Sequence, residues 1–256
     1  MGPSMNHFEL YDACVTQPLP VVRFLQHVHG ARPKILREDF AGTAAVARQW
    51  LHSVPKGQAV AVDRDPKPLA HAALAGVTCV VSDVLRCRTK ADVVTATNFA
   101  LGYCHSRAEL VAYLRHARAC LKPRGIFVAD VYGGSHAMLT GQHVRTVPLE
   151  KGPACVEFVF EQRATDPVLG LVENALHFGL KTSPSSRPRW LRNAFVYRWR
   201  LWSPAELTDA LGDAGFAAPR WFDSLGDEET KASRAHEHKP GQPLEDDWVL
   251  HLAARR

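Results

Sequence analysis

Acidic residues close three successive apolar segments in the first third of the chain. Glu38 ends KILRE, Asp63 ends AVAVD, and Asp83 ends TCVVSD. The spacing from Glu38 to Asp63 is close to the roughly 20 residues at which a strand–helix–strand unit presents an acid to a ribose. Carboxylates at such positions accept hydrogen bonds from the hydroxyl and amino groups of a nucleotide. The pattern therefore indicates a nucleotide-cofactor site.

A turn of small residues follows the first of these acids, in the sequence KILREDFAGTAAVA. Gly42 and its alanine neighbours allow a ligand to approach the backbone, and Thr43 is expected to cap the helix that follows. Glu38 and Asp39 are adjacent, and only one of them needs to face a cofactor. We favour Glu38. The turn lacks the G-x-G-x-x-G pattern that an NAD-binding protein would use.

Strands and helices alternate up to residue 134. The hydrophobic patterns predict strands at 34–38, 59–63, 79–82, 92–97 and 126–130, and helices at 20–29, 66–75 and 107–121. Ser106 and Glu109 form a capping-box pattern at the start of the last helix. This alternation is typical of a parallel sheet with helices on both faces, in which ligands bind beyond the carboxyl ends of the strands. Five polar residues lie at those ends: Glu38, Asp63, Asp83, Asn98 and Asp130.

The second half of the chain has a different pattern. Alternating apolar and polar residues predict an antiparallel sheet over about 143–201, followed by a helix at 203–215 that Gly215 ends. Further strands are expected at 216–222 and 248–254, with a mobile polar loop at 223–247 between them. The chain thus divides into four segments: an N-terminal helical cap (1–32), a cofactor-binding core (33–138), an antiparallel β insertion over the active site (139–202), and a C-terminal helix and hairpin that complete the core sheet (203–256).

Composition limits the possible partners. The net charge of +5 is modest, and no tract of lysine and arginine resembles a nucleic-acid-binding arm. The six cysteines form no C-x-x-C pair, which indicates reduced, mostly structural thiols and a cytoplasmic protein. No apolar run approaches the ~20 residues of a membrane span, and the thirteen histidines form no metal-binding motif. We therefore expect no membrane partner and no metal, and the oligomeric state stays open.

Taken together, these motifs resemble those of the class I S-adenosylmethionine-dependent methyltransferases. The resemblance covers nearly the whole chain and includes the glycine-bearing first loop, the strand-end acids, NFALGY after the fourth strand, LKPRGIFVAD, and the late helix WSPAELTDALGDAGF. It implies a Rossmann-like, seven-stranded, mostly parallel α/β sheet with helices on both faces and an antiparallel β insertion after strand five. Phe40 and Ala44 stand where the family more often has glycine.

The resemblance also implies roles for individual residues toward S-adenosylmethionine. Glu38 corresponds to the acid that receives the methionine ammonium group, Asp63 to the acid that accepts the ribose hydroxyls, and Asp83 to the acid that faces the adenine amino group. The complete cofactor-binding set implied is Tyr11, Glu38, Phe40, Ala41, Gly42, Asp63, Arg64, Asp83, Val84, Asn98 and Phe99.

Methyl transfer from a sulfonium is an in-line displacement, so positioning the acceptor is a large part of the catalysis. A base is needed only when the acceptor arrives protonated. Tyr103 and His105 are the catalytic candidates. The candidates for binding a small-molecule acceptor are Tyr132, Tyr197, Trp199 and Arg200. The last three lie on a strand that also fits an ordinary amphipathic pattern.

Two other functions remain open. An RNA or protein methyltransferase is suggested by arginines interleaved with aromatic residues between Arg187 and Arg200, a composition suited to phosphate contact and base stacking. Nucleic acid is not favoured, because NFAL after the fourth strand is unlike the N-P-P-Y loop of base methyltransferases. A non-catalytic cofactor-binding interaction protein would explain the departures at Phe40 and Ala44.

Overall fold

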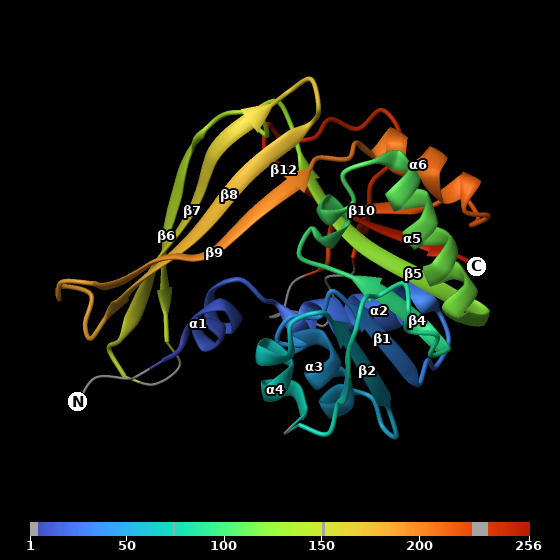
Figure 1. Cartoon of the computed structure of the whole chain (residues 1–256), viewed down its shortest axis with the longest axis horizontal. Helices are drawn as coiled ribbons and strands as arrows, with labels where there is room; N and C mark the ends of the chain where they lie inside the picture. Colours follow the sequence, from blue (N-terminus) through green and yellow to red (C-terminus); the bar gives the residue numbers. More distant parts are fainter. Residues whose placement is uncertain (1–4, 74, 150–151, 227–234) are drawn as a thin grey trace. The chain divides into compact units, whose positions relative to one another are not determined.

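The computed structural model describes residues 5–73, 75–149, 152–226 and 235–256. Within these ranges the chain forms two compact units, one made of residues 5–16 and 138–201 and the other of residues 17–137 and 202–256. Figure 1 shows the elements of both units in the order of the sequence.

The larger unit is built on an eight-stranded sheet with the order β11-β10-β12-β5-β4-β1-β2-β3. Its strands are β1 (Ile35–Asp39), β2 (Gln58–Asp63), β3 (Thr78–Val81), β4 (Ala91–Ala96), β5 (Leu121–Gly133), β10 (Arg220–Ser224), β11 (His236–Glu237) and β12 (Trp248–Arg255). Strands β1 to β5 pair in parallel, whereas β12 runs antiparallel to β5 and β10. The predicted mostly parallel α/β fold is therefore confirmed.

Helices cover both faces of this sheet because alternate strand residues are apolar on each face. The helices are α2 (Pro18–His29), α3 (Ala45–Ser53), α4 (Pro66–Ala73), α5 (Arg107–Cys120) and α6 (Pro204–Asp213), with a short 3-10 helix η1 (Ala100–Tyr103). Leu36 of β1 lies in the core that α2, α3 and α4 cover. Val94 and Phe127 lie in the core under α5 and α6.

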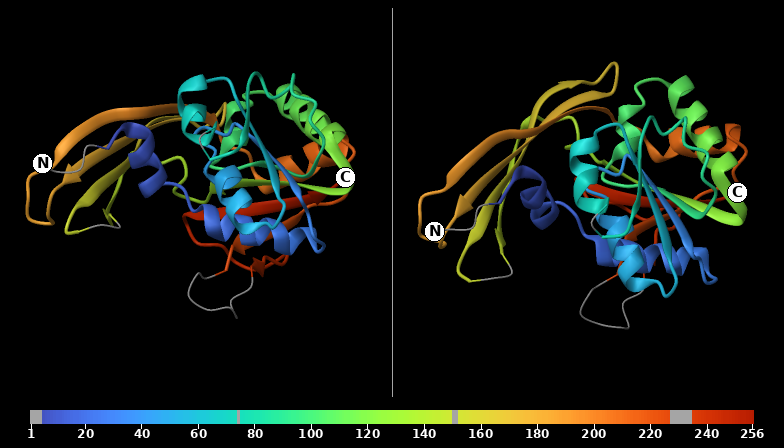
Figure 2. Two further views of the ribbon diagram at one scale, coloured as in Figure 1. Left: turned by 90° about the horizontal axis from the view of Figure 1, so that it is seen from below. Right: turned by 60° about the horizontal axis from the view of Figure 1, so that its bottom comes forward.

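The smaller unit is a four-stranded antiparallel sheet with one short helix. Its elements are α1 (His7–Cys14), β6 (Gly141–Pro148), β7 (Cys155–Asp166), β8 (Leu171–Lys181) and β9 (Arg189–Arg200). The strands pair in sequence order, and Figure 2 shows these long strands side by side. Leu10 and Cys14 of α1 pack on Phe158 and Phe178 of the sheet. The predicted antiparallel sheet is confirmed, and β6 extends it on the N-terminal side.

Three expectations about the C-terminal region were wrong. The core sheet has eight strands instead of seven, because the two-residue β11 pairs with β10 at the sheet edge. The strand predicted at 216–222 begins only at Arg220, after Pro219, which has no N–H to donate. The loop predicted to be mobile at 223–247 contains the end of β10 and all of β11. Residues 227–234 of that loop lie outside the described residues.

Candidate active site

The turn after β1 contains left-handed backbone conformations, which glycine adopts more readily than other residues. Phe40, Gly42 and Ala44 have φ angles of 54°, 51° and 54°. Phe40 and Ala44 thus occupy the left-handed region at the positions where the resembling family more often has glycine. Ala44 is fully buried, and Phe40 packs edge-on against Tyr113 with 5.3 Å between ring centroids. Phe40 and Ala44 therefore adopt the left-handed conformation of the turn and also pack in the core.

Glu38 caps the helix that follows this turn. The N-cap position of α3 is Ala44, so the prediction that Thr43 occupies it was wrong. Instead, Oε2 of Glu38 accepts a hydrogen bond of 2.7 Å from the backbone N–H of Ala47. A carboxylate is favoured there because the first turn of a helix has unpaired N–H groups and the positive end of the helix dipole. Glu38 is 4% exposed and lies directly under the turn.

Gly42 joins the turn to the end of β2. Its N–H donates to Oδ2 of Asp63 at 2.7 Å, and Oδ1 of Asp63 accepts from the N–H of Asp65 at 2.9 Å. A Cβ added at Gly42 would meet no atom within 4 Å, so the space beside this backbone is open. An open glycine backbone beside a half-buried carboxylate suits the ribose and amino-acid parts of S-adenosylmethionine, because both carry hydroxyl or ammonium donors.

The segment after β3 carries the third acid. Oδ1 of Asp83 accepts from the N–H of Leu85 at 2.8 Å, and Arg64 forms an ion pair with the other carboxylate oxygen. The hydrogen bond from Leu85 and the ion pair with Arg64 lower the pKa of Asp83, although partial burial opposes them. Asp83 is therefore an ionised acceptor, which matches the donor character of an adenine amino group. Val84 beside it is buried.

The loop after β4 is held by Asp130 of β5. The N–H groups of Asn98 and Phe99 donate to Oδ2 and Oδ1 of Asp130 at 3.0 and 2.6 Å. Both loop residues have positive φ angles, 57° and 61°, so the carboxylate stabilises a conformation that is otherwise unfavourable. Burial raises the pKa of Asp130 to about 6 against the lowering effect of these bonds. The Phe99 ring lies 4.8 Å from that of Tyr132.

The catalytic candidates lie just beyond this loop. Tyr103 ends η1, is 47% exposed, and stacks on Phe40 with 5.8 Å between ring centroids. The backbone N–H of His105 donates to Oε2 of Glu109, as part of the capping of α5, and its ring is exposed. Tyr103 is thus linked to the turn after β1, whereas His105 is anchored to α5.

The remaining candidates belong to the smaller unit. Tyr197 and Trp199 of β9 stack with 4.4 Å between centroids and an interplanar angle of 12°, and Phe195 continues the row at 6.2 Å from Tyr197. Tyr11 of α1 lies 5.0 Å from Phe195. Arg200 follows at the end of β9 and is half-buried. Phe195, Tyr197 and Trp199 thus form a continuous aromatic row on that sheet, which Tyr11 of α1 extends at one end.

The candidates of the larger unit lie at the carboxyl ends of its strands. These ends lie together because β1 to β5 run parallel. Contacts link Gly42 to Asp63 and Phe40 to Tyr103. Asp39, the alternative to Glu38, is 1% exposed and is bonded to the guanidinium of Arg37 inside the core. Sequence reasoning missed this buried pair, although an arginine within an apolar strand was a visible signal.

The described residues contain neither a metal-binding cluster nor a membrane-spanning helix. No group of three or more histidine, cysteine, aspartate or glutamate side chains in them is placed to hold a metal ion. None of the described helices has the length and hydropathy needed to cross a membrane. All six cysteines are unpaired, and five of them are buried.

Comparison with known proteins identifies the fold. No protein-family model matches the chain, and no curated protein matches it in sequence. Solved structures do match. The structure of DesVI from Streptomyces venezuelae is 15% identical, with a TM-score of 0.72, over 98% of this chain and 99% of that one. CalS10, an amino pentose methyltransferase from Micromonospora echinaspora involved in calicheamicin biosynthesis and solved with bound S-adenosylmethionine, is 15% identical with a TM-score of 0.70, over 100% and 99% of the two chains.

A third solved structure also matches over nearly the whole of both chains. The sugar N-methyltransferase KedS8 from a Streptoalloteichus species is 16% identical, with a TM-score of 0.68, over 100% of this chain and 94% of that one. The similarity to these structures spans both the core sheet and the antiparallel sheet, because nearly the whole chain is covered. This chain therefore has the fold of S-adenosylmethionine-dependent methyltransferases such as CalS10.

Proposed function

We propose that the protein is an S-adenosylmethionine-dependent methyltransferase that acts on a small-molecule acceptor. The observation that carries the proposal is the bond between Gly42 and Asp63, which places an open glycine backbone beside a strand-end carboxylate. Asp83 lies one strand further along the same sheet edge, since β3 pairs in parallel with β2. Acids at these successive strand ends match the hydroxyl and amino donors of one extended nucleotide cofactor.

In this proposal the cofactor is held by the carboxyl edge of the larger unit. Glu38 and the turn from Phe40 to Gly42 bind its methionine part, and Asp63 accepts from the ribose hydroxyls. Arg64, Asp83 and Val84 surround the adenine, while Asn98 and Phe99 lie beside the sulfur. Tyr11 completes the proposed cofactor-binding set. When bound, S-adenosylmethionine would supply an electrophilic methyl group on a positively charged sulfur, and this sulfur would be the leaving group when the acceptor takes the methyl group.

The protein's own contribution to catalysis is to position the acceptor and to manage its proton. Tyr103 is proposed as the main catalytic group, because its exposed ring is fixed against Phe40 of the turn. His105 is the second candidate. Tyr132, with Tyr197, Trp199 and Arg200 of the smaller unit, is proposed to bind the acceptor. Tyr197 is half-buried and stacks on Trp199, which is only 5% exposed, so Tyr197 is the ring of this pair that is proposed to contact the face of a sugar or another ring.

The acceptor class is proposed from the same fold comparison. CalS10 is an amino pentose methyltransferase and KedS8 a sugar N-methyltransferase, so amino sugars are the first acceptors to test. A cytoplasmic location is part of the proposal, because six unpaired cysteines suit a reducing compartment.

The proposal is tested by measuring S-adenosylhomocysteine production from S-adenosylmethionine with a panel of amino sugars, phenols and RNA. The proposal would be supported if a small molecule is turned over at a rate that does not depend on ionic strength and if this turnover is lost in Asp63→Ala. Turnover only with RNA, falling steeply as salt rises, would instead support the RNA methyltransferase alternative. Cofactor binding without turnover on any acceptor would favour the non-catalytic one.

A further inference from the structure

Arg37 is a fully buried arginine in the middle of the core sheet. It lies in β1, pairs with Val60 of β2 and Val94 of β4, and is 0% exposed. Burying a guanidinium is costly unless its donors are all engaged, because it remains protonated in proteins. An apolar residue at this position would fill a β-strand core without that cost. The contacts that Arg37 makes must therefore explain its presence.

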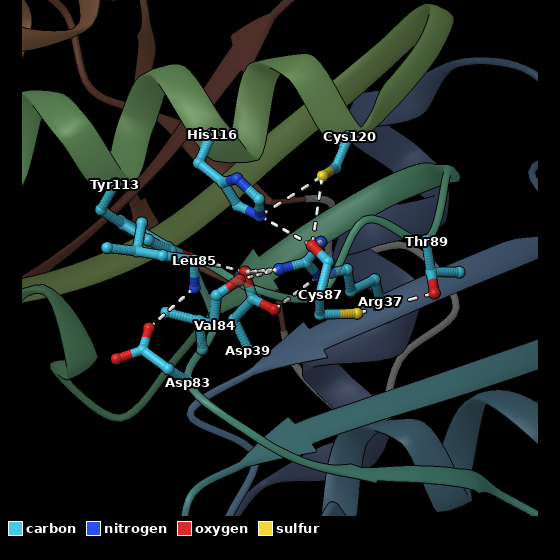
Figure 3. A network of polar contacts seen from close by, with 10 residues as sticks. All are labelled: Arg37, Asp39, Asp83, Val84, Leu85, Cys87, Thr89, Tyr113, His116 and Cys120. Carbon is cyan, nitrogen blue, oxygen red and sulfur yellow. Dashed lines mark hydrogen bonds and ion pairs between the residues drawn. The ribbon is translucent and has the colours of Figure 1, made fainter.

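The guanidinium bridges Asp39 and the segment that follows β3. Its Nε and Nη2 donate to the two carboxylate oxygens of Asp39 at 2.6 and 3.2 Å. The same Nη2 donates to the backbone carbonyl of Val84 at 2.8 Å, and Nη1 donates to that of Cys87 at 2.7 Å. Figure 3 shows this network, with Arg37 lying between the carboxylate and the two carbonyls. Arg37 thus anchors the segment at two points three residues apart.

The contact of Arg37 with the carbonyl of Val84 is connected to the carboxylate of Asp83 through the next peptide group. The carbonyl of Val84 and the N–H of Leu85 belong to one planar peptide group and point in opposite directions. The carbonyl accepts from Arg37, and the N–H donates to Oδ1 of Asp83 at 2.8 Å. Fixing the peptide plane therefore fixes the direction of the hydrogen bond that holds Asp83. That bond is also the main cause of the lowered pKa of Asp83.

Other contacts hold the same parts. Nε2 of His116 lies 2.7 Å from the carbonyl of Cys87, and a turn bond of 2.9 Å joins the N–H of Arg86 to the carbonyl of Asp83. The hydroxyl of Tyr113 donates to Asp39 at 3.1 Å. The Tyr113 hydroxyl thus bonds the carboxylate of Asp39 and not the carbonyls of Val84 and Cys87. It supports the ion pair but does not anchor the segment after β3.

We propose that Arg37 is a positioning residue for recognition of the adenine base: by clamping the carbonyls of Val84 and Cys87, it holds the carboxylate of Asp83 in the orientation that accepts from the adenine amino group. The inference rests on the proposed function and names the buried group on which its base specificity depends. Lysine cannot replace it, because a single ammonium lacks the planar fork that reaches acceptors in several directions at once.

The experiment compares the binding of two ligands by calorimetry. S-adenosylhomocysteine carries the 6-amino group, and S-inosylhomocysteine carries a carbonyl oxygen in its place, which would face the Asp83 carboxylate unfavourably. The ratio of the two affinities measures recognition at that one position. The wild type should prefer S-adenosylhomocysteine by roughly 10- to 100-fold, the range expected for one hydrogen bond to a charged group.

Two variants remove the clamp in different ways. Arg37→Lys keeps a cation beside Asp39, and the double variant Arg37→Met with Asp39→Leu replaces the ion pair by apolar side chains, an exchange that often preserves stability. In both, the preference for the amino ligand should fall below about threefold. The matched control is Tyr113→Phe, which loses a bond to Asp39 but leaves both carbonyl contacts, and its preference should equal that of the wild type. Thermal unfolding of each variant establishes that it is folded.

The outcomes separate this inference from the proposed function. If folded Arg37→Lys or the double variant retains the wild-type preference, the inference is wrong even where both ligands bind more weakly, because Arg37 is then merely structural. Failure of the double variant to fold leaves the decision to Arg37→Lys, and failure of both to fold would overturn the specific role in favour of a general one in stability. If the wild type binds neither ligand, the proposed function fails and takes this inference with it.

Discussion

The carboxylate of Asp63 accepts a hydrogen bond from the backbone N–H of Gly42, with 2.7 Å between Oδ2 and the nitrogen. This bond ties the end of β2 to the turn after β1, two segments that the parallel pairing of these strands brings to the same sheet edge. Asp63 therefore has two roles in the account: it fixes the turn, and it offers its carboxylate to the ribose of the proposed cofactor.

The first prediction concerns this carboxylate. Asp63→Ala should weaken S-adenosylhomocysteine binding by roughly 2 to 4 kcal/mol, because two ribose hydrogen bonds to a charged acceptor are lost. Calorimetric titration measures the change. Asp65→Ala is the matched control: the side chain of Asp65 accepts from the N–H of Lys67 at the start of α4, and its backbone N–H, which donates to Asp63, is kept in the variant, so affinity should be unchanged. Equal affinities for wild type and Asp63→Ala would remove Asp63 from the site.

A second prediction uses the open space at Gly42. Alanine there would meet no atom within 4 Å, but it would have to adopt a φ of 51°. That conformation costs an L-residue about 1 kcal/mol, so Gly42→Ala should unfold only a few degrees lower than the wild type. Its methyl group would occupy the space over the backbone, and affinity for S-adenosylhomocysteine should fall by about tenfold or more.

The control for this variant is Gly212→Ala. Gly212 lies in α6, and an added Cβ there also meets nothing within 4 Å. Alanine is a better helix former than glycine, so this variant should be slightly more stable and should bind the cofactor normally. Normal binding by Gly42→Ala would show that the cofactor does not approach this turn.

A third prediction concerns pH. Burial raises the pKa of Asp130 to about 6, whereas an unfolded aspartate titrates near 3.9. Between these values the folded protein holds a proton that the unfolded chain releases, so the free energy of unfolding falls as pH rises through this window. Asp130→Asn does not titrate. The stability of the wild type relative to this variant should therefore fall by roughly 3 kcal/mol at most between pH 4 and pH 7.

Chemical denaturation at several pH values measures this difference. His251 has a pKa lowered to about 4 by burial, and its contribution has the opposite sign. Because His251 lies directly opposite Asp130 in the pairing of β5 with β12, the comparison is also made in a His251→Gln background, which removes its titration. A relative stability that is constant or rises with pH would contradict a raised pKa at Asp130.

How much of this the sequence could predict depends on how local each feature is. The capping box at Ser106 and the left-handed Gly215 after α6 were predicted, because each involves residues within a few positions of one another. The core strands were readable too, since buried parallel strands are continuous apolar runs.

Features that depend on distant partners were not predictable. Glu38 caps α3 from nine residues upstream, so the nearby Thr43 looked like the better cap. The strand β11 forms only because His236 and Glu237 pair with β10. An arginine within an apolar strand signalled the buried pair of Arg37 and Asp39, but the carbonyls that complete its bonds lie 47 and 50 residues further along the chain.

The fourth prediction addresses catalysis. Tyr103→Phe keeps the ring that stacks on Phe40 and removes the hydroxyl, so affinity for S-adenosylhomocysteine should be unchanged. If the hydroxyl orients or deprotonates the acceptor, kcat should fall by about 10²-fold or more. Steady-state kinetics at saturating cofactor measure the change. An unchanged kcat would transfer the catalytic role away from Tyr103 and leave His105 as the candidate to test.

We expect the carboxyl ends of the core strands to bind S-adenosylmethionine, and calorimetric titration of the purified protein is the decisive experiment. The ligands are S-adenosylmethionine and S-adenosylhomocysteine, with NAD and ATP as controls. We expect micromolar binding of the first two ligands and no comparable binding of the controls. Absence of binding by both sulfur ligands, or equal binding of NAD, would contradict this expectation.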